Sequence, residues 1–158
     1  MNKENRPAKI ESFKINHNTL TEGIYISRRD GDIVTYDLRT RRPNMGDYMD
    51  NVTMHSVEHM IATYIRSSEI GESVIYFGPM GCRTGFYLLV RDCVSADGVL
   101  AALKGALRRT AEHCGEVFGA SARECGNYKE LDLASAKREC SRFLNVLESR
   151  TQTFEYAE

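Results

Sequence analysis

The segment from residue 55 to residue 59, His-Ser-Val-Glu-His, places two histidines and a glutamate close together. Residues on a helix turn by about 100° each, so His59 returns to within about 40° of His55. Side chains at i and i+4 lie one above the other, and two imidazoles placed in this way can bind a single metal ion. Glu58 borders the same face and suits a base beside the metal better than a third ligand. The spacing predicts a metal clamp on a helix with a general base at its edge.

The same segment can be interpreted in two other ways. The order His-x-x-Glu-His is the signature of inverted zinc peptidases, so a small metallopeptidase is the first alternative. A polar patch on a helix, without any metal, is the second. A catalytic centre also needs a third protein ligand and an open coordination position. Cys125, in the segment "RECGNY", is one candidate for that ligand, and His17 and His113 are the others.

A second reactive group is Cys82, in the segment "GPMGCRTG". Glycines on either side place this cysteine in a tight turn between two expected strands, where its sulfur could face a cleft. A neighbouring cation, Arg83 or a bound metal, would favour the thiolate form that acts in catalysis. The alternative interpretation is a loop cysteine without a chemical role.

The elements that must position these groups follow from periodicity and turn residues. Apolar residues recur at spacings of three and four between residues 51 and 68, which indicates a helix with one buried face. Asn51 or Thr53 is its expected N-cap. Runs rich in Ile, Val, Tyr and Phe indicate strands. The expected elements are a hairpin over 22–40, strands over 73–77 and 85–92, and helices over 51–68, 96–113 and 132–149.

Strands and helices do not alternate regularly along this order, as a parallel sheet would require. The sequence therefore predicts a single α+β domain over residues 1–158, with an antiparallel sheet and helices packed on one face. Residues 1–11 are polar and contain a proline, so a loose arm is expected there.

Bulk composition excludes several classes of protein. The net charge is −1, with charged residues at 27% of the chain, so no basic field exists to hold nucleic acid or an anionic membrane. No apolar run is long enough to span a bilayer. The five cysteines include no Cys-x-x-Cys pair, which argues against a disulfide framework. The N-terminal segment resembles neither a signal nor a transit peptide, so a cytoplasmic protein acting on a small molecule or a protein partner is expected.

Five ordered motifs together resemble the S-ribosylhomocysteine lyase (LuxS) family. They cover almost the whole chain: "ESFKINHNTL", "YDLRTRRPN", "HSVEHMIATYIRS", "GPMGCRTGFYLLV" and "ECGNY". The resemblance implies an α+β fold, a homodimer with two active sites at the subunit interface, and a divalent metal. That metal is natively Fe(II), one per subunit, and zinc or cobalt can substitute for it.

The resemblance also assigns roles to residues of this chain. The implied metal ligands are His55, His59 and Cys125, and the implied acid-base groups are Cys82 and Glu58. The implied substrate-binding residues are Ser12, His17 and Arg39, with Arg66 as a weaker candidate. Which subunit supplies Glu58 and Arg39 to each site is left open.

The family reaction cleaves the thioether of S-ribosylhomocysteine to homocysteine and 4,5-dihydroxy-2,3-pentanedione, the precursor of autoinducer-2. It implies a role in quorum sensing or in the methyl cycle. One departure from the family pattern is the segment Tyr76-Phe77-Gly78, where better-known members have Asp-Ile-Ser. This departure puts in doubt the family's contact to the homocysteine end of the substrate.

Overall fold

The computed structural model describes residues 7–157 as one α+β domain. Its sheet is antiparallel throughout, in the strand order β1-β2-β4-β3. The chain begins with a short 3-10 turn, η1 (Glu11–Phe13), and a second one, η2 (Gly71–Ser73), precedes β3. The strands are β1 (Gly23–Asp30), β2 (Ile33–Arg39), β3 (Val74–Pro79) and β4 (Gly85–Arg91). The predicted hairpin and strand pair are confirmed.

Three helices of equal length complete the fold: α1 (Asn51–Arg66), α2 (Ala96–Ala111) and α3 (Leu133–Glu148). Each begins with a side-chain cap on the backbone N–H three residues later, a favourable contact for the unpaired first turn. The caps are Asp50, Ser95 and Asp132. The prediction of Asn51 or Thr53 as the cap of α1 was wrong, because Asp50 precedes them and its carboxylate accepts from the Thr53 N–H at 2.7 Å.

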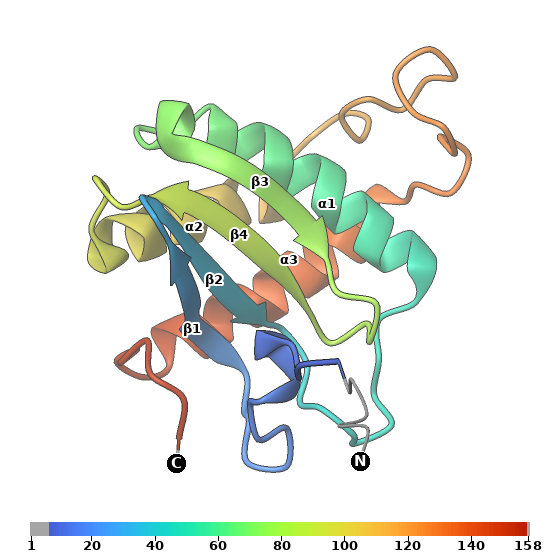
Figure 1. The fold of residues 1–158 in the computed structure, drawn as a ribbon. Helices are drawn as coiled ribbons and strands as arrows, with labels where there is room; N and C mark the ends of the chain where they lie inside the picture. The colour runs from blue at the N-terminus through green and yellow to red at the C-terminus, as the bar shows by residue number, and fades with distance from the viewer. Residues whose placement is uncertain (1–6, 158) are drawn as a thin grey trace, which may run out of the picture.

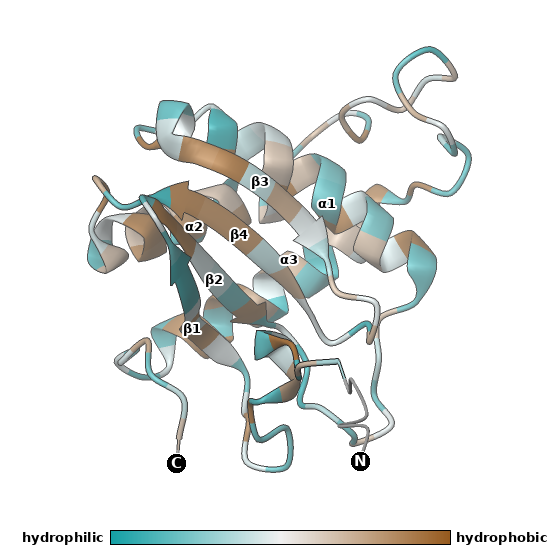
Figure 2. Cartoon of the chain, in the orientation of Figure 1, coloured by the Kyte–Doolittle hydropathy of each residue, from teal (hydrophilic) through white to brown (hydrophobic). Residues whose placement is uncertain are grey.

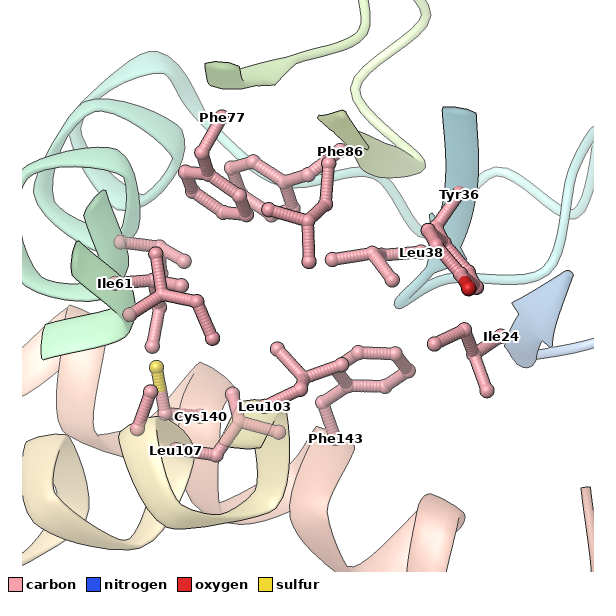
Figure 3. Packing of buried hydrophobic residues seen from close by; sticks show 14 of the residues in the cluster. Ile24, Tyr36, Leu38, Ile61, Phe77, Phe86, Leu103, Leu107, Cys140 and Phe143 are labelled. Carbon is pink, nitrogen blue, oxygen red and sulfur yellow. The ribbon is translucent and has the colours of Figure 1, made fainter. Parts of the chain in front are cut away.

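All three helices lie on one face of the sheet, as predicted (Figure 1). Apolar residues are concentrated on β3, β4 and the helices behind them (Figure 2). Figure 3 shows Phe77 and Phe86 of the sheet packed toward Leu103, Leu107 and Phe143 of the helices. These side chains are almost fully removed from water, and this burial is the main stabilising contribution to the fold.

The opposite face of the sheet carries polar groups. Successive side chains of a strand point to opposite faces, so Tyr36 and Leu38 enter the core while Asp37 and Arg39 face away from the helices. Both charged residues are nevertheless buried, at 0% and 1% exposure. Residues 7–10 of the expected arm are exposed and have no regular structure, and residues 1–6 lie outside the described residues. No helix in the described range is long and apolar enough to cross a membrane.

Candidate active site

The histidine pair meets Cys125 in one cluster. His55 and His59 lie in the first turns of α1, and Cys125 lies in the loop over 112–132 that joins α2 to α3. The candidate donor atoms of the three residues all lie within 4.8 Å of one another. The Cys125 Sγ is 3.3 Å from His55 Nε2. Of the three candidates for the third ligand, the fold therefore brings Cys125 to the pair, whereas His17 and His113 contact other groups.

Backbone carbonyls of the same loop fix the orientation of both imidazoles. His55 Nδ1 is 2.9 Å from the carbonyl oxygen of Glu130, and His59 Nδ1 is 2.7 Å from that of Phe118. A carbonyl only accepts a hydrogen bond, so the proton of each neutral ring must be on Nδ1. The Nε2 lone pairs are then free to bind a metal. Carbonyl partners of this kind are the usual outer support of metal-binding histidines.

The loop approaches α1 closely enough to require a glycine. Gly119 has a φ of +69°, and a Cβ at this position would lie 3.1 Å from His59 Nδ1. A larger residue would be strained and would press on the ring. Two imidazole nitrogens and one thiolate are a donor set that suits a divalent transition metal with one coordination position left for another molecule. The residues present therefore fit a catalytic metal site.

Glu58 lies on α1 between the two histidines in sequence, and its side chain is half-buried. Within residues 7–157, no side-chain hydrogen bond of the Glu58 carboxylate stands beside the histidine contacts, so the group is not held in an ion pair. It is also outside the group of three metal ligands. The role of a base beside the metal, predicted from helical spacing, stays a prediction.

Cys82 lies in a second cluster, in the turn between β3 and β4. This turn borders a pocket of about 340 Å³. The lining of the pocket includes Cys82, Tyr87 and three of the substrate-binding residues that the family resemblance implies, which are Ser12, His17 and Arg39. The short turn η1 and the segment after it carry Ser12 and His17 to the same end of the sheet as Arg39. Residues far apart in sequence thus form one pocket.

Arg39 is the cation nearest to the Cys82 sulfur. Its Nη1 lies 3.8 Å from Sγ and also donates to the Thr84 hydroxyl at 2.7 Å. The Thr84 Oγ1 is in turn 3.1 Å from the sulfur. The sequence suggested Arg83 as this cation. The backbone turns there at a φ of +62°, and the Arg83 guanidinium lies over the ring of Tyr48.

Asp37 holds the guanidinium of Arg39 in place. Its carboxylate accepts from Arg39 Nε at 3.1 Å and from Nη2 at 2.7 Å, a bidentate pair shielded from water. Burial alone lowers the pKa of Arg39, but the attraction and hydrogen bonds of Asp37 more than offset this, so the pKa is raised and the charge is permanent. Glycines face Arg39 on both neighbouring strands, Gly23 on β1 and Gly85 on β4.

Arg66 is placed apart from both clusters. It ends α1, and its guanidinium donates to the carbonyl oxygens of Val74 and Ile75 at 3.2 and 3.1 Å. These bonds connect the end of the helix to the start of β3. The fold therefore brings Ser12, His17 and Arg39 to the Cys82 pocket and leaves Arg66 outside it.

The departure at Tyr76-Phe77-Gly78 has a structural counterpart. The Tyr76 side chain lies directly over Gly78, where an added Cβ would be 2.0 Å from the phenol oxygen. Tyr76 and Gly78 are therefore compatible as a pair, since a side chain at 78 would displace the ring. Tyr76 is half-exposed, on the strand that leads into the Cys82 turn.

Thr84, Asp37 and Tyr87 were missed as site residues in the sequence. The alternation of β2 places Asp37 and Arg39 on one face, which is a detectable signal, but a charged pair usually indicates a solvated surface. Tyr87 alternates with core residues of β4, and burial raises its pKa, so its phenol stays neutral beside the pocket. Thr84 carries no such signal, since its role depends on a turn that approaches β2.

Comparisons with known proteins identify the family of this chain. The family model for S-ribosylhomocysteinase (LuxS) matches residues 10–154. An S-ribosylhomocysteine lyase from Finegoldia magna is 43% identical, over 88% of this chain and 91% of its own length. Those from Clostridium beijerinckii and Borreliella afzelii are 43% and 40% identical, over 87% and 88% of this chain and 89% and 92% of their own lengths. The chain belongs to the S-ribosylhomocysteinase (LuxS) family.

Proposed function

We propose that the protein is a metal-dependent S-ribosylhomocysteine lyase, a carbon-sulfur lyase that releases homocysteine and 4,5-dihydroxy-2,3-pentanedione. The observation that carries the proposal is the cluster of His55, His59 and Cys125, with both histidines oriented by loop carbonyls. The family match and the relatives' names support it. A metallopeptidase uses a similar histidine pair, but none of the relatives reported above carries that name.

The proposed reaction is a series of proton transfers without net oxidation or reduction. A thioether next to an unactivated carbon leaves poorly, so the sugar carbonyl must first migrate from C1 to C3. The C4 proton then becomes acidic, and its removal expels the C5 sulfur as a thiolate. A bound divalent metal supplies Lewis-acid polarisation of oxygen in such chemistry.

The chain's own acid-base groups fit the proton transfers. Cys82 as thiolate and Glu58 as carboxylate are proposed to remove and return protons at neighbouring sugar carbons. Arg39, whose Nη1 is 3.8 Å from the Cys82 sulfur, is proposed as the cationic partner of the thiolate. Ser12 and His17, which line the same pocket, are proposed to hold the substrate's polar groups.

Fe(II) is the proposed metal, one per subunit, with zinc or cobalt able to replace it. This choice rests on the family resemblance, because a set of two imidazoles and one thiolate binds zinc more tightly than Fe(II). Metal analysis of protein purified without oxygen tests the choice directly. A majority of another metal in cells grown with ample iron would overturn it.

A homodimer with active sites at the subunit interface is the proposed assembly. The candidate metal ligands form one cluster, and Cys82 with the proposed substrate-binding residues lines a different pocket. A molecular mass in solution near twice the chain's 17.9 kDa is expected from light scattering. A monomer with full activity would contradict the assembly.

The proposed location is the cytoplasm, and the proposed context is autoinducer synthesis or the methyl cycle. The five cysteines are all free thiols, as a reducing compartment would keep them. A strain lacking the protein should accumulate S-ribosylhomocysteine. Normal levels of this thioether in that strain would contradict the proposed context.

The lyase and the peptidase are separated by parallel incubations. Anaerobically purified protein is incubated with S-ribosylhomocysteine and with casein, each with and without a chelator, and free thiol and peptides are measured. The lyase predicts thiol release that the chelator suppresses and no cleavage of casein. Chelator-sensitive proteolysis without thiol release would support the peptidase.

A further inference from the structure

The segment after α3 folds back against the free edge of the sheet. Phe154 forms a parallel bridge with Tyr25 of β1, and the Ile26 N–H donates to the Phe154 carbonyl at 2.8 Å. Arg150 donates to the carbonyl of Glu22 just before β1. These backbone contacts fix the path of the last described residues. Tyr156, two residues after the bridge, therefore lies on the face of the sheet that carries Asp37.

Tyr156 makes two contacts on that face. Its ring stacks on Tyr25, with centroids 4.9 Å apart and planes at 11°. Its hydroxyl donates to Asp37 Oδ2 at 2.8 Å. Burial, followed by the negative charge of Asp37, raises the pKa of Tyr156 well above its ordinary range, so the phenol remains protonated and can donate.

The contact to Asp37 extends toward the reactive sulfur through two further residues. The Oδ2 that accepts from Tyr156 also accepts from Arg39 Nη2 at 2.7 Å. Arg39 in turn contacts the sulfur of Cys82 and the hydroxyl of Thr84. Asp37 and Arg39 are almost completely buried. If either loses a hydrogen-bond partner, water does not reach the group to replace it, so the loss costs free energy. The Tyr156 hydroxyl therefore contacts the buried pair of Asp37 and Arg39, and Arg39 contacts the exposed Cys82 at the other end of this network.

We propose that Tyr156 is a positioning residue whose hydroxyl, through Asp37, sets the position of Arg39 against the Cys82 thiolate. Without this donor, Asp37 Oδ2 has one strong partner left, and the guanidinium shifts toward the carboxylate and away from the sulfur. The inference rests on the proposed function, in which Cys82 moves protons as a thiolate. Tyr156 lies beyond residues 10–154, the part of the chain that the family model matches. The proposed positioning contact thus comes from a residue outside the matched range.

The test is the Tyr156→Phe substitution, which keeps the ring for stacking on Tyr25 and removes only the hydroxyl. Tyr25→Phe is the matched control, because it removes the hydroxyl of the other stacked ring, which donates to the Thr21 carbonyl. Two quantities are measured in the full-length, metal-loaded protein. One is the rate of Cys82 alkylation by iodoacetamide, followed by peptide mass spectrometry with the exposed Cys93 as internal reference. The other is kcat and KM for thiol release.

Tyr156→Phe is expected to slow Cys82 alkylation and to lower kcat, each by about three- to tenfold, the range for losing part of a hydrogen bond to a charged group. KM should stay within about twofold, because Tyr156 does not line the pocket, and Tyr25→Phe should match the unchanged protein in both measurements. The Cys93 rate and the thermal unfolding midpoint show that both variants are folded.

Wild-type alkylation and kcat in Tyr156→Phe would overturn the proposal. Equal losses in both variants would overturn it too, because they would assign the effect to a general disturbance of the stacked tyrosine pair and not to the hydrogen bond with Asp37. Alkylation is independent of turnover, so it separates this inference from the proposed function. Slower alkylation of Cys82 in Tyr156→Phe, in a protein that releases no thiol even when unsubstituted, would uphold the positioning role and refute the lyase.

Discussion

The metal cluster and the cysteine pocket are held in place by different means. At the metal cluster, two backbone carbonyls of one loop orient both histidines, and a glycine lets the loop approach. At the cysteine pocket, the Arg39 guanidinium, which is held by a buried ion pair with Asp37, and the Thr84 hydroxyl contact the sulfur. Backbone groups support the metal cluster, whereas side chains support the cysteine pocket. Substitutions of neighbouring side chains should therefore perturb the cysteine pocket more than the metal cluster. Each prediction below tests one side of this difference.

The largest effect is expected from His59→Ala. Loss of one of three ligands removes most of the metal affinity, so bound metal and thiol release should both fall to background. Elemental analysis of protein purified without oxygen measures the metal. His17→Ala is the matched control from the cysteine pocket and should keep its metal while losing activity. Unchanged metal content in His59→Ala would refute the ligand assignment.

Cys82→Ser and Glu58→Gln should separate chemistry from metal binding. Each removes a proposed acid-base group, and such groups contribute about 10²- to 10⁴-fold to the rate. We expect this loss in homocysteine release, with metal content and circular dichroism unchanged. A variant that retains full activity would remove its residue from the mechanism.

Asp37→Asn should lower the stability of the fold as well as activity. It leaves the Arg39 charge buried without its partner, a change that costs about 3–5 kcal/mol in comparable buried pairs. The free energy of unfolding in urea measures this loss. Asp30→Asn breaks the exposed pair with Arg28 on the hairpin and is expected to leave the unfolding curve nearly unchanged. Equal effects of the two substitutions would contradict the stabilising role given to the buried pair.

Thr84→Val is expected to have the smallest effect. The substitution keeps the shape of the side chain and removes the hydroxyl between Arg39 and the Cys82 sulfur, so kcat should fall by about tenfold, the equivalent of one hydrogen bond. Steady-state kinetics of thiol release measure this change. Thr110→Val removes another buried hydroxyl, in α2, and should leave kcat unaltered. A wild-type kcat in Thr84→Val would show that the hydroxyl does not act on the sulfur.

Local patterns predicted the parts of the site that lie on one element. Helical spacing paired His55 with His59 and placed Glu58 at the edge, because three residues of one helix have a fixed relation. Cys125 was only one of three candidates, since its approach depends on how the loop over 112–132 folds. The supporting carbonyls of Phe118 and Glu130 are backbone groups, which no residue type reveals.

The cysteine pocket was harder to predict because four segments form it. The alternation of β2 puts Asp37 and Arg39 on one face, but nothing in that pattern indicates that this charged face is buried. Tyr156 covers part of this face, in a C-terminal segment that pairs with β1 through the bridge between Tyr25 and Phe154. Long-range contacts of this kind leave no periodic pattern in the sequence.

The most direct measurement follows thiol release from S-ribosylhomocysteine while metal is returned to chelator-treated protein in the absence of oxygen. If the metal cluster and the cysteine pocket act in one lyase, thiol release should rise in proportion to bound metal and saturate at one ion per chain. Cys82→Ser should bind the same metal and release no thiol. Metal-loaded wild-type protein that releases no thiol, or equal release by Cys82→Ser, would contradict the account.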